Sequence, residues 1–375
     1  MHENVWQILF LILCLYPIIG AFFWFWGAMA YRFLKTNKRD LDWHELSMDQ
    51  QPYITIMIPA HNEEVMIKDT ISYLFDQLNY QQFEILVLND GSTDQTAAIL
   101  TQLQTKYDRL RVINIEKNKG KAHAFNIGMF FAKGDYILSN DADTIPEPDA
   151  LMKYMNFFIH DQDLNTAAVT ANMDVQNRST LLGKSQTVEF SSIVGVIKRS
   201  QSAINDSMYA YSGANTMYRK DTLIEVGGFR QNRATEDISI AWDHQEHGTV
   251  PRFAPEIIFH MNVPETIGDL FKQRKRWAQG GTEVWLTNLP SFLRHPIQHR
   301  YQFSMFIDST LSVIWSFFFV GSTIAFVGQL TVALGRGDRS QVVNLFLLAG
   351  IFIGFELIAG LFQLITALIC GSQWR

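Results

Sequence analysis

Long apolar runs at both ends of the chain frame a central segment in which short apolar runs alternate with amphipathic ones. Val5 to Tyr31 and Ser309 to Leu334 contain no charged residue, and Gln341 to Cys370 contains only Glu356. Each run exceeds the roughly 20 residues that an α-helix needs to cross a bilayer. The first run is too long and too aromatic for a signal peptide, and no small-residue cleavage site follows it. The pattern therefore predicts three transmembrane helices.

The central segment predicts a parallel sheet that is covered by helices. Strand-like runs occur at residues 53–60, 83–90, 111–116, 135–141 and 166–173. The run FEILVLND is almost continuously apolar, as expected for a strand that is buried on both faces. Helix-length segments lie between the strands at residues 64–78, 94–107 and 121–132. This alternation is typical of a doubly wound α/β sheet.

Polar residues gather where these predicted strands end. The ends carry Asn62-Glu63-Glu64, Asn89-Asp90-Gly91 and Asn140-Asp141-Ala142-Asp143. Alone, each group could simply form a turn or a helix cap, because Asp and Asn oxygens accept from loose backbone N–H groups. Ligands of doubly wound sheets, however, bind beyond the carboxyl ends of the strands. Three acidic strand ends at one edge therefore favour a binding site. Asp141 and Asp143 could either bind a metal as a pair or cap the next helix.

Charge on the flanks of the first apolar run predicts the orientation. Arg32 and Lys35 follow that run, with Lys38 and Arg39 shortly after. Positively charged residues stay on the cytoplasmic side of a membrane helix. We therefore predict a multi-pass plasma membrane protein whose N-terminus is outside and whose segment 40–300 is cytoplasmic.

Composition excludes two classes of protein. Lys and Arg total 31 against 37 Asp and Glu, which gives a net charge of −6 and no basic field for nucleic acid. The two cysteines, Cys14 and Cys370, both lie in apolar runs, which excludes a disulfide framework.

A basic amphipathic segment follows the predicted sheet. It carries Trp277 and Trp285 with four cations, Lys272, Arg274, Lys275 and Arg276, which suits a helix at the membrane surface. Its motif QRKRW, residues 273–277, either meets lipid head groups or closes a guanidinium and an indole over a sugar diphosphate. The predicted segments are an N-terminal transmembrane helix at 1–35, a cytoplasmic α/β domain at 36–263, an amphipathic interface region at 264–300 and two transmembrane helices at 301–375.

The central segment lacks the common glycine-rich nucleotide motifs. Arg178 stands where a phosphate loop before Gly183-Lys184-Ser185 requires its first glycine, and no dinucleotide fingerprint follows the first strand. Nucleotide binding here must therefore use carboxylates and a metal. The motif NKGK contains Lys119 and Lys121. These residues either form a turn that leads into a helix or bind a diphosphate.

A second acidic motif precedes a helical pattern. Thr235, Glu236 and Asp237 form either an ordinary N-cap or a catalytic carboxylate pair. His244 and His247 lie further along the same helical pattern. Without an HExxH pattern or a cysteine beside them, zinc is not favoured.

The order of these motifs resembles that of a known family. Asn89-Asp90, Asp141-Ala142-Asp143, Thr235-Glu236-Asp237 and QRKRW follow one another between membrane spans. This order resembles the processive membrane glycosyltransferases of family 2, which include cellulose, chitin, hyaluronan and poly-N-acetylglucosamine synthases. Within the family, segments 177–201 and 263–284 look most like the poly-β-1,6-N-acetylglucosamine synthases. The resemblance covers nearly the whole chain.

The resemblance implies a glycosyltransferase-A fold, which is Rossmann-like, and a UDP-sugar donor bound with Mg²⁺ or Mn²⁺. Carried over by position, Asp143 and Asp141 would bind the metal, and Asp237 would be the catalytic base. The implied substrate-binding residues are Asp90 at the uridine, Asp141 at the diphosphate, and Lys121, Glu236, Gln273, Arg276 and Trp277.

The residue types suit this chemistry. Hard divalent cations prefer carboxylate and phosphate oxygens. An inverting transfer needs one base on the acceptor side, and one carboxylate, Asp237, supplies it. Arg276 adds positive charge that does not depend on pH. An α-linked donor would thus give a β-linked product.

The resemblance implies processive, inverting transfer of N-acetylglucosamine from UDP-N-acetylglucosamine to a growing β-1,6-linked polysaccharide, coupled to export as a biofilm exopolysaccharide. The implied partners are the UDP-sugar, the polysaccharide, the lipid bilayer and a small accessory membrane subunit, with no nucleic acid. Relatives usually carry further helices after the third span, so a channel would need that subunit or a longer chain. The alternatives are another family 2 synthase, a transferase that adds one sugar to a lipid phosphate, and an inactive membrane scaffold or transporter.

Overall fold

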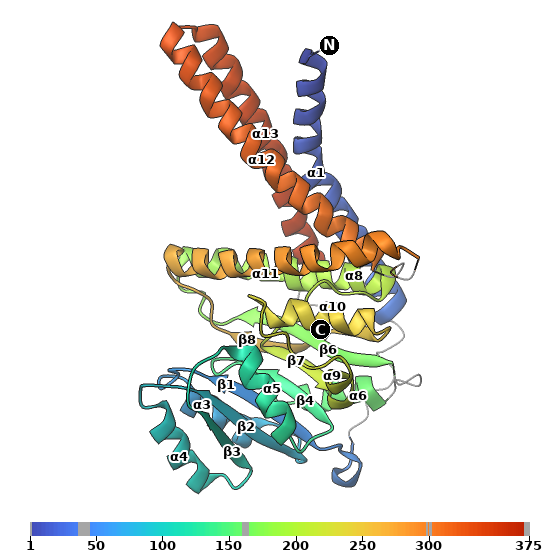
Figure 1. Cartoon of the computed structure of the whole chain (residues 1–375), viewed down its shortest axis with the longest axis vertical. Helices are drawn as coiled ribbons and strands as arrows, with labels where there is room; N and C mark the ends of the chain where they lie inside the picture. Colours follow the sequence, from blue (N-terminus) through green and yellow to red (C-terminus); the bar gives the residue numbers. More distant parts are fainter. Residues whose placement is uncertain (1, 37–45, 160–164, 298, 300–301, 371–375) are drawn as a thin grey trace.

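A mixed sheet lies in the lower half of the molecule in Figure 1, and long helices extend upward from it beyond α11 (Ile267–Arg294). The computed structural model describes residues 2–36, 46–159, 165–297, 299 and 302–370. In these residues the strands form one sheet with the order β3-β2-β1-β4-β7-β6-β8-β5. They are β1 Ile54–Ala60, β2 Phe83–Asp90, β3 Leu110–Ile115, β4 Tyr136–Asn140, β5 Ile145–Pro146, β6 Thr166–Val175, β7 Asn215–Arg219 and β8 Val250–Met261.

Helices cover both faces of the sheet and make up the extended part of the molecule. Those before the middle of the chain are α1 His2–Tyr31, η1 Arg32–Thr36, η2 Met48–Gln50, α3 Ile67–Gln77, α4 Thr96–Lys106, α5 Lys121–Phe131 and α6 Ala150–Ile159. The later ones are α7 Leu181–Phe190, η3 Ser191–Ile197, α8 Lys198–Asn205, α9 Lys220–Glu225, α10 Glu236–Glu246, α11 Ile267–Arg294, α12 Phe303–Arg336 and α13 Arg339–Cys370.

The first half of the sheet is parallel, as predicted. β1 pairs in parallel with β2 on one side and with β4 on the other, and β2 pairs in parallel with β3. Alternate side chains enter two separate cores: Ile56 and Ile85 pack in the cluster that includes α3 and α6, whereas Met57 and Leu86 pack in the cluster that includes α5. Burial on both faces explains the continuous apolar runs, since each fully buried side chain of this size contributes about 1.5–3 kcal/mol.

The second half of the sheet departs from the simple parallel prediction. β7 is antiparallel to both β4 and β6, whereas β8 is parallel to β6 and antiparallel to β5. The sequence pattern missed β7 and β8. β8 contains Pro251 and Pro255, and its pairing with β6 slips between Ala254 and Ile258. Proline cannot donate to a neighbouring strand, so such a strand lacks the usual signature.

Two predicted helices begin later than expected, because their first acidic residues belong to loops. Glu64 lies before α3, and its carboxylate accepts from the backbone N–H of Gln95 at 2.9 Å. Asp94 lies before α4 and accepts from the N–H of Thr96 at 3.0 Å. Asn62 adopts a positive φ of 59°. These contacts tie the β1–α3 loop to the β2–α4 loop beyond the strand ends.

Three helices are long and apolar enough to cross a membrane, at Cys14–Leu34, Met305–Arg336 and Arg339–Leu361. Their number and positions agree with the prediction from the sequence, and the protein is a membrane protein. α11 lies crosswise between these helices and the sheet (Figure 1). The Tyr31 hydroxyl at the end of α1 donates to the Phe253 carbonyl of β8 at 2.9 Å. The first membrane helix is therefore fastened directly to the sheet domain.

Candidate active site

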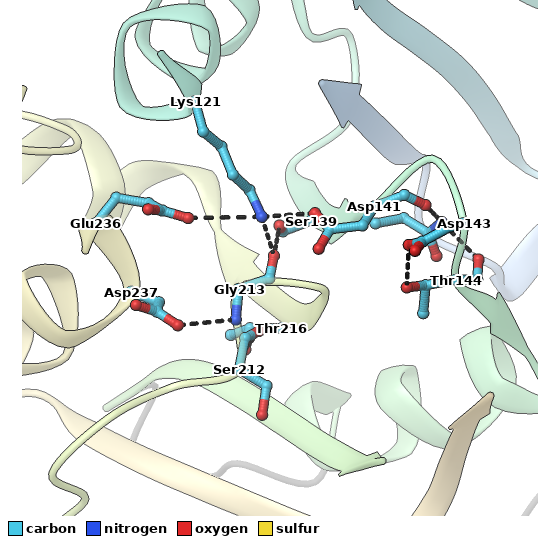
Figure 2. Close-up of polar contacts among 11 residues, drawn as sticks. Lys121, Ser139, Asp141, Asp143, Thr144, Ser212, Gly213, Thr216, Glu236 and Asp237 are labelled. Atoms are coloured by element: carbon cyan, nitrogen blue, oxygen red, sulfur yellow. Dashed lines mark hydrogen bonds and ion pairs between the residues drawn. The ribbon is translucent and has the colours of Figure 1, made fainter. Parts of the chain in front are cut away.

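The loop that follows β4 carries the two predicted metal ligands. A turn forms there, since the Thr144 N–H donates to the Asp141 carbonyl at 3.2 Å and the Asn140 amide donates to the same oxygen at 2.8 Å. The side chains of Asp141 and Asp143 do not cap the next helix. Asp143 accepts from the Thr144 hydroxyl at 3.2 Å, and Asp141 accepts from Lys121 (Figure 2). The backbone makes the turn and leaves both carboxylates for other contacts.

Lys121 joins this loop to the second acidic motif. Its Nζ, at the start of α5, lies 2.6 Å from Asp141 Oδ1, 3.5 Å from Glu236 Oε1 and 3.0 Å from the Gly213 carbonyl (Figure 2). Burial acts to lower the pKa of Lys121, but Asp141 and Glu236 outweigh burial and raise the pKa above its usual value. Lys121 is therefore a permanent cation between the strand-end loop and α10.

Asp237 lies on the other side of Gly213. Its Oδ2 accepts from the Gly213 N–H at 3.2 Å, and its Oδ1 accepts from its neighbour Ile238 N–H at 2.9 Å. Thr235 occupies the N-cap position of α10, but its side chain makes no capping bond. Burial, followed by the charge of Glu236, raises the pKa of Asp237 to about 6. A carboxylate with a pKa near neutrality can take a proton efficiently.

Acidic groups concentrate at the strand ends. Burial and then Asp141 raise the pKa of Asp143. Burial raises the pKa of Glu63 to about 7, with Asp143 and Asp141 as the next causes. Such crowding of carboxylates creates a negative potential that a cation relieves. Within the described residues no group of three or more His, Cys, Asp or Glu is arranged to hold a metal. Asp141 and Asp143 supply carboxylate oxygens, the donors that hard divalent cations prefer.

Asp90 anchors the NKGK loop. The residue is only 4% exposed, and its carboxylate accepts from the backbone N–H groups of Lys119 at 3.3 Å and Gly120 at 3.0 Å. Gly120 has a φ of 90°, a conformation that a side chain would strain. Asp90 therefore holds the loop that leads directly into Lys121. Its predicted contact with uridine remains a prediction.

Comparison with known proteins gives matches over most of the chain. The sequence profile of glycosyl transferase family 2 matches residues 55–227. The chain is 34% identical to the poly-beta-1,6-N-acetyl-D-glucosamine synthase of Staphylococcus aureus (strain COL) over 310 residues, which cover 82% of this chain and 73% of the relative. It is 32% identical to the synthase of the same name from Staphylococcus epidermidis, over 91% of this chain and 89% of the relative.

This chain belongs to glycosyl transferase family 2. A solved mannosyltransferase from Pyrobaculum calidifontis, in complex with GDP-mannose and Mn²⁺, shares the fold, with a TM-score of 0.68, 19% identity and coverage of 97% of both chains. The glycosyltransferase-A fold that the sequence predicted is thereby confirmed.

The QRKRW motif of this glycosyltransferase lies on α11. Arg274 forms two bonds with Glu189, at 2.9 and 2.7 Å, and its guanidinium lies 4.3 Å from the centre of the Trp277 ring. The rings of Phe190 and Trp277 pack nearly perpendicular to each other, with 6.2 Å between their centres. Gln273 is half-buried and accepts from Arg274, whereas Arg276 is exposed. Arg274, which the sequence reasoning did not select, is the residue that positions Trp277. The roles of Gln273, Arg276 and Trp277 toward donor and acceptor remain predictions.

Gly213 is a further site residue that the sequence reasoning missed in this glycosyltransferase. Its carbonyl accepts from Lys121, and its N–H donates to Asp237. An added Cβ would lie 3.2 Å from both the Glu236 carboxylate and Lys121 Nζ. The only signal in the sequence was a short run of small residues, Ser-Gly-Ala at 212–214, directly before a strand.

His244 of α10 has a structural role. His244 is fully buried, and its Nδ1 lies 3.2 Å from the Tyr211 hydroxyl. Asp243 pairs with Arg230 at 2.6 Å. Asp243 and His244 thus serve packing around α10.

Gly280 of α11 packs closely against the start of α10, which allows the role of α11 in the active site to be tested. A Cβ at this position would overlap the side chain of Thr235, the residue before Glu236. We expect Gly280→Ala to cost about 1–3 kcal/mol in the free energy of unfolding, and to lower the transfer rate by about 10²-fold through displacement of Asp237.

The control for Gly280→Ala is Gly268→Ala on the same helix, where the nearest atom to an added Cβ lies 4.0 Å away. Thermal unfolding and a transfer assay on both variants test the expectation. A Gly280→Ala enzyme as active as the wild type would show that α11 does not hold the start of α10.

Proposed function

We propose that this enzyme transfers N-acetylglucosamine from UDP-N-acetylglucosamine, with inversion, to a growing β-1,6-linked polysaccharide. The observation that supports it best is the bridge made by Lys121 between Asp141 and Glu236, beside Asp237. Two candidate metal ligands, a cation and a candidate base thereby meet in one cluster. The sugar and the linkage come from the names of the synthases that the chain resembles over most of its length.

On the donor side, Asp141 and Asp143 would hold Mg²⁺ or Mn²⁺ together with oxygens of the diphosphate. When bound, the cation would offset the negative charge that develops on the departing diphosphate. Lys121 places a second positive charge at the same loop, because Asp141 and Glu236 keep it protonated. Asp90 would contact the uridine, and it already fixes the NKGK loop that carries Lys121.

On the acceptor side, Asp237 would take the proton of the attacking hydroxyl. The hydroxyl oxygen bonds to the anomeric carbon while the bond from that carbon to the diphosphate breaks, and UDP leaves with the electron pair. Attack from the face opposite to the diphosphate converts an α-linked donor into a β-linked product. Trp277, held between Arg274 and Phe190, supplies a rigid aromatic ring on which a sugar of the acceptor can stack.

The test of this function is an assay of the purified, full-length enzyme in lipid with radiolabelled UDP-sugars. We expect UDP-N-acetylglucosamine alone to give a long polymer that an enzyme specific for β-1,6-linked poly-N-acetylglucosamine degrades. A polymer of another sugar would favour another synthase of the family. A single sugar on a lipid phosphate would favour a lipid-phosphate transferase, and no release of UDP from any donor would overturn the proposal.

We propose further that the domain between α1 and α12 faces the cytoplasm. The cations at Arg32, Lys38 and Arg39 support this orientation. The enzyme would then bind UDP-sugars that are made in the cytoplasm. During export the polymer would cross the membrane beside α11.

Cysteine labelling tests this topology. In a chain whose own cysteines are replaced by alanine, a cysteine at the exposed Gln104 of α4 should resist a membrane-impermeant thiol reagent in intact cells. A cysteine near Gly337, at the exposed Asp338 between α12 and α13, should react. Both positions should react in permeabilised cells, which controls for burial. The reverse pattern in intact cells would invert the topology.

A further inference from the structure

Lys198 is a buried cation for which the described residues offer no ion pair. It begins α8 and is 6% exposed. Its Nζ donates to the Ser212 hydroxyl at 2.6 Å and lies 3.4 Å from the Thr170 hydroxyl. Burying an ammonium group without a carboxylate partner costs several kcal/mol, so neutral side chains are usually preferred there. Packing alone therefore does not explain a lysine at this position.

The contacts of Lys198 lead to the candidate base. Ser212 is followed by Gly213, whose N–H donates to Asp237 Oδ2 at 3.2 Å. The Ser212 N–H donates to the Thr170 hydroxyl at 3.1 Å, so the loop is fastened to β6 as well as to Lys198. The ammonium thus contacts the residue next to the peptide that holds the Asp237 carboxylate.

We propose that Lys198 is a positioning residue for Asp237: its ammonium keeps the carboxylate ionised, and its bond to Ser212 fixes the peptide that donates to that carboxylate. The proposal rests on the proposed function, in which Asp237 is the base. Lys121 also acts on Asp237, but its charge is shared with Asp141 and Glu236.

The electrostatics agree with this geometry. Burial lowers the pKa of Lys198 to about 7, against the opposing charge of Asp237. Burial and Glu236 raise the pKa of Asp237, while Lys121 and Lys198 both act to lower it. Two tyrosines near Asp237 are neutral: burial raises the pKa of Tyr209 to about 12, and also raises that of Tyr218. Lys198 is therefore one of two cations that keep the base available.

The test is the pH dependence of kcat in neutral and charged variants of the full-length enzyme. In Lys198→Met and Lys198→Gln, the acidic limb of the profile should move up by about one pH unit or more. At a fixed pH below the limb, activity as a fraction of its plateau should be about ten-fold lower in these variants than in the wild type. Lys198→Arg should keep the wild-type limb, and KM for UDP-N-acetylglucosamine should change little in all of them.

Lys184→Met, at an exposed lysine of α7, is the matched control and should leave the profile unchanged. An unchanged limb in a folded neutral variant would overturn the proposal, as would equal losses in all three variants without a shift. Failure of both neutral variants to fold would also overturn it, because the cation would then belong to the fold. If instead Asp237→Asn remains active, the proposed base itself is wrong, which separates the two failures.

Discussion

Asp237→Asn is expected to stop polysaccharide synthesis while leaving donor binding largely intact. The amide keeps the shape of the carboxylate and can still contact the Gly213 N–H, but it cannot take a proton. Removal of a general base typically lowers the rate by about 10²–10⁴-fold. Asp90, Asp141 and Asp143 remain in place, so calorimetry should show UDP binding with metal close to that of the wild type.

The control for Asp237→Asn is Glu246→Gln, an acid-to-amide change at an exposed position of the same helix. It should retain polymer synthesis. Arg276→Ala offers a contrast, since loss of the proposed contact between Arg276 and the diphosphate should weaken both UDP binding and turnover. If Asp237→Asn makes polymer at nearly the wild-type rate, Asp237 only stabilises the first turn of α10, and the base lies elsewhere.

The wild-type pH profile carries the same expectation. Burial and Glu236 raise the pKa of Asp237 to about 6, so the base is ionised above that pH and protonated below it. Activity should therefore increase as the pH rises through about 6. A profile that stays flat from pH 5 to pH 7 would show that Asp237 does not accept the proton in the reaction.

Asp143→Asn is expected to abolish turnover and metal-dependent binding of UDP. Burial and Asp141 raise the pKa of Asp143, which marks it as a carboxylate that a cation would stabilise. The amide is a neutral and weaker ligand for a hard cation. Calorimetry of UDP with and without Mg²⁺ or Mn²⁺ should show the metal-dependent part of the affinity disappear, and EDTA should silence the wild type reversibly.

Asp149→Asn is the matched control for the metal ligand. Asp149 lies in the next turn along the chain and pairs with Lys153 at 2.9 Å, away from Asp141. This variant should retain both turnover and the effect of metal on UDP binding. Wild-type activity that persists in EDTA and metal-free buffer would rule out a metal at Asp141 and Asp143.

Much of the fold could be predicted because its signals are local. Strands buried on both faces gave continuous apolar runs, as in Phe83–Asp90, and uncharged runs of more than about 20 residues gave the membrane helices. β7 and β8 escaped prediction because β7 is short and β8 contains Pro251 and Pro255, so neither shows the periodicity of a regular strand.

The motifs at the strand ends could be predicted because parallel strands bring their carboxyl ends to one edge. Asp90, Asp141 and Asp143 were selected on that rule, and Glu236 and Asp237 through their order relative to QRKRW. The sequence by itself therefore determined the fold class, the membrane helices and which acidic residues to suspect.

Only the tertiary structure decided which contacts those residues make. The bridge from Lys121 to Asp141 and Glu236 joins positions 20 and 115 residues apart in the chain, and no local pattern predicts it. Three further residues were found only from their contacts in space. The Gly213 N–H donates to Asp237, the buried Lys198 donates to Ser212, and Arg274 packs against the Trp277 ring. The acidity of Asp237 likewise depends on burial and on charges from α5 and α8, because electrostatic interactions depend on distance in space rather than on separation along the chain.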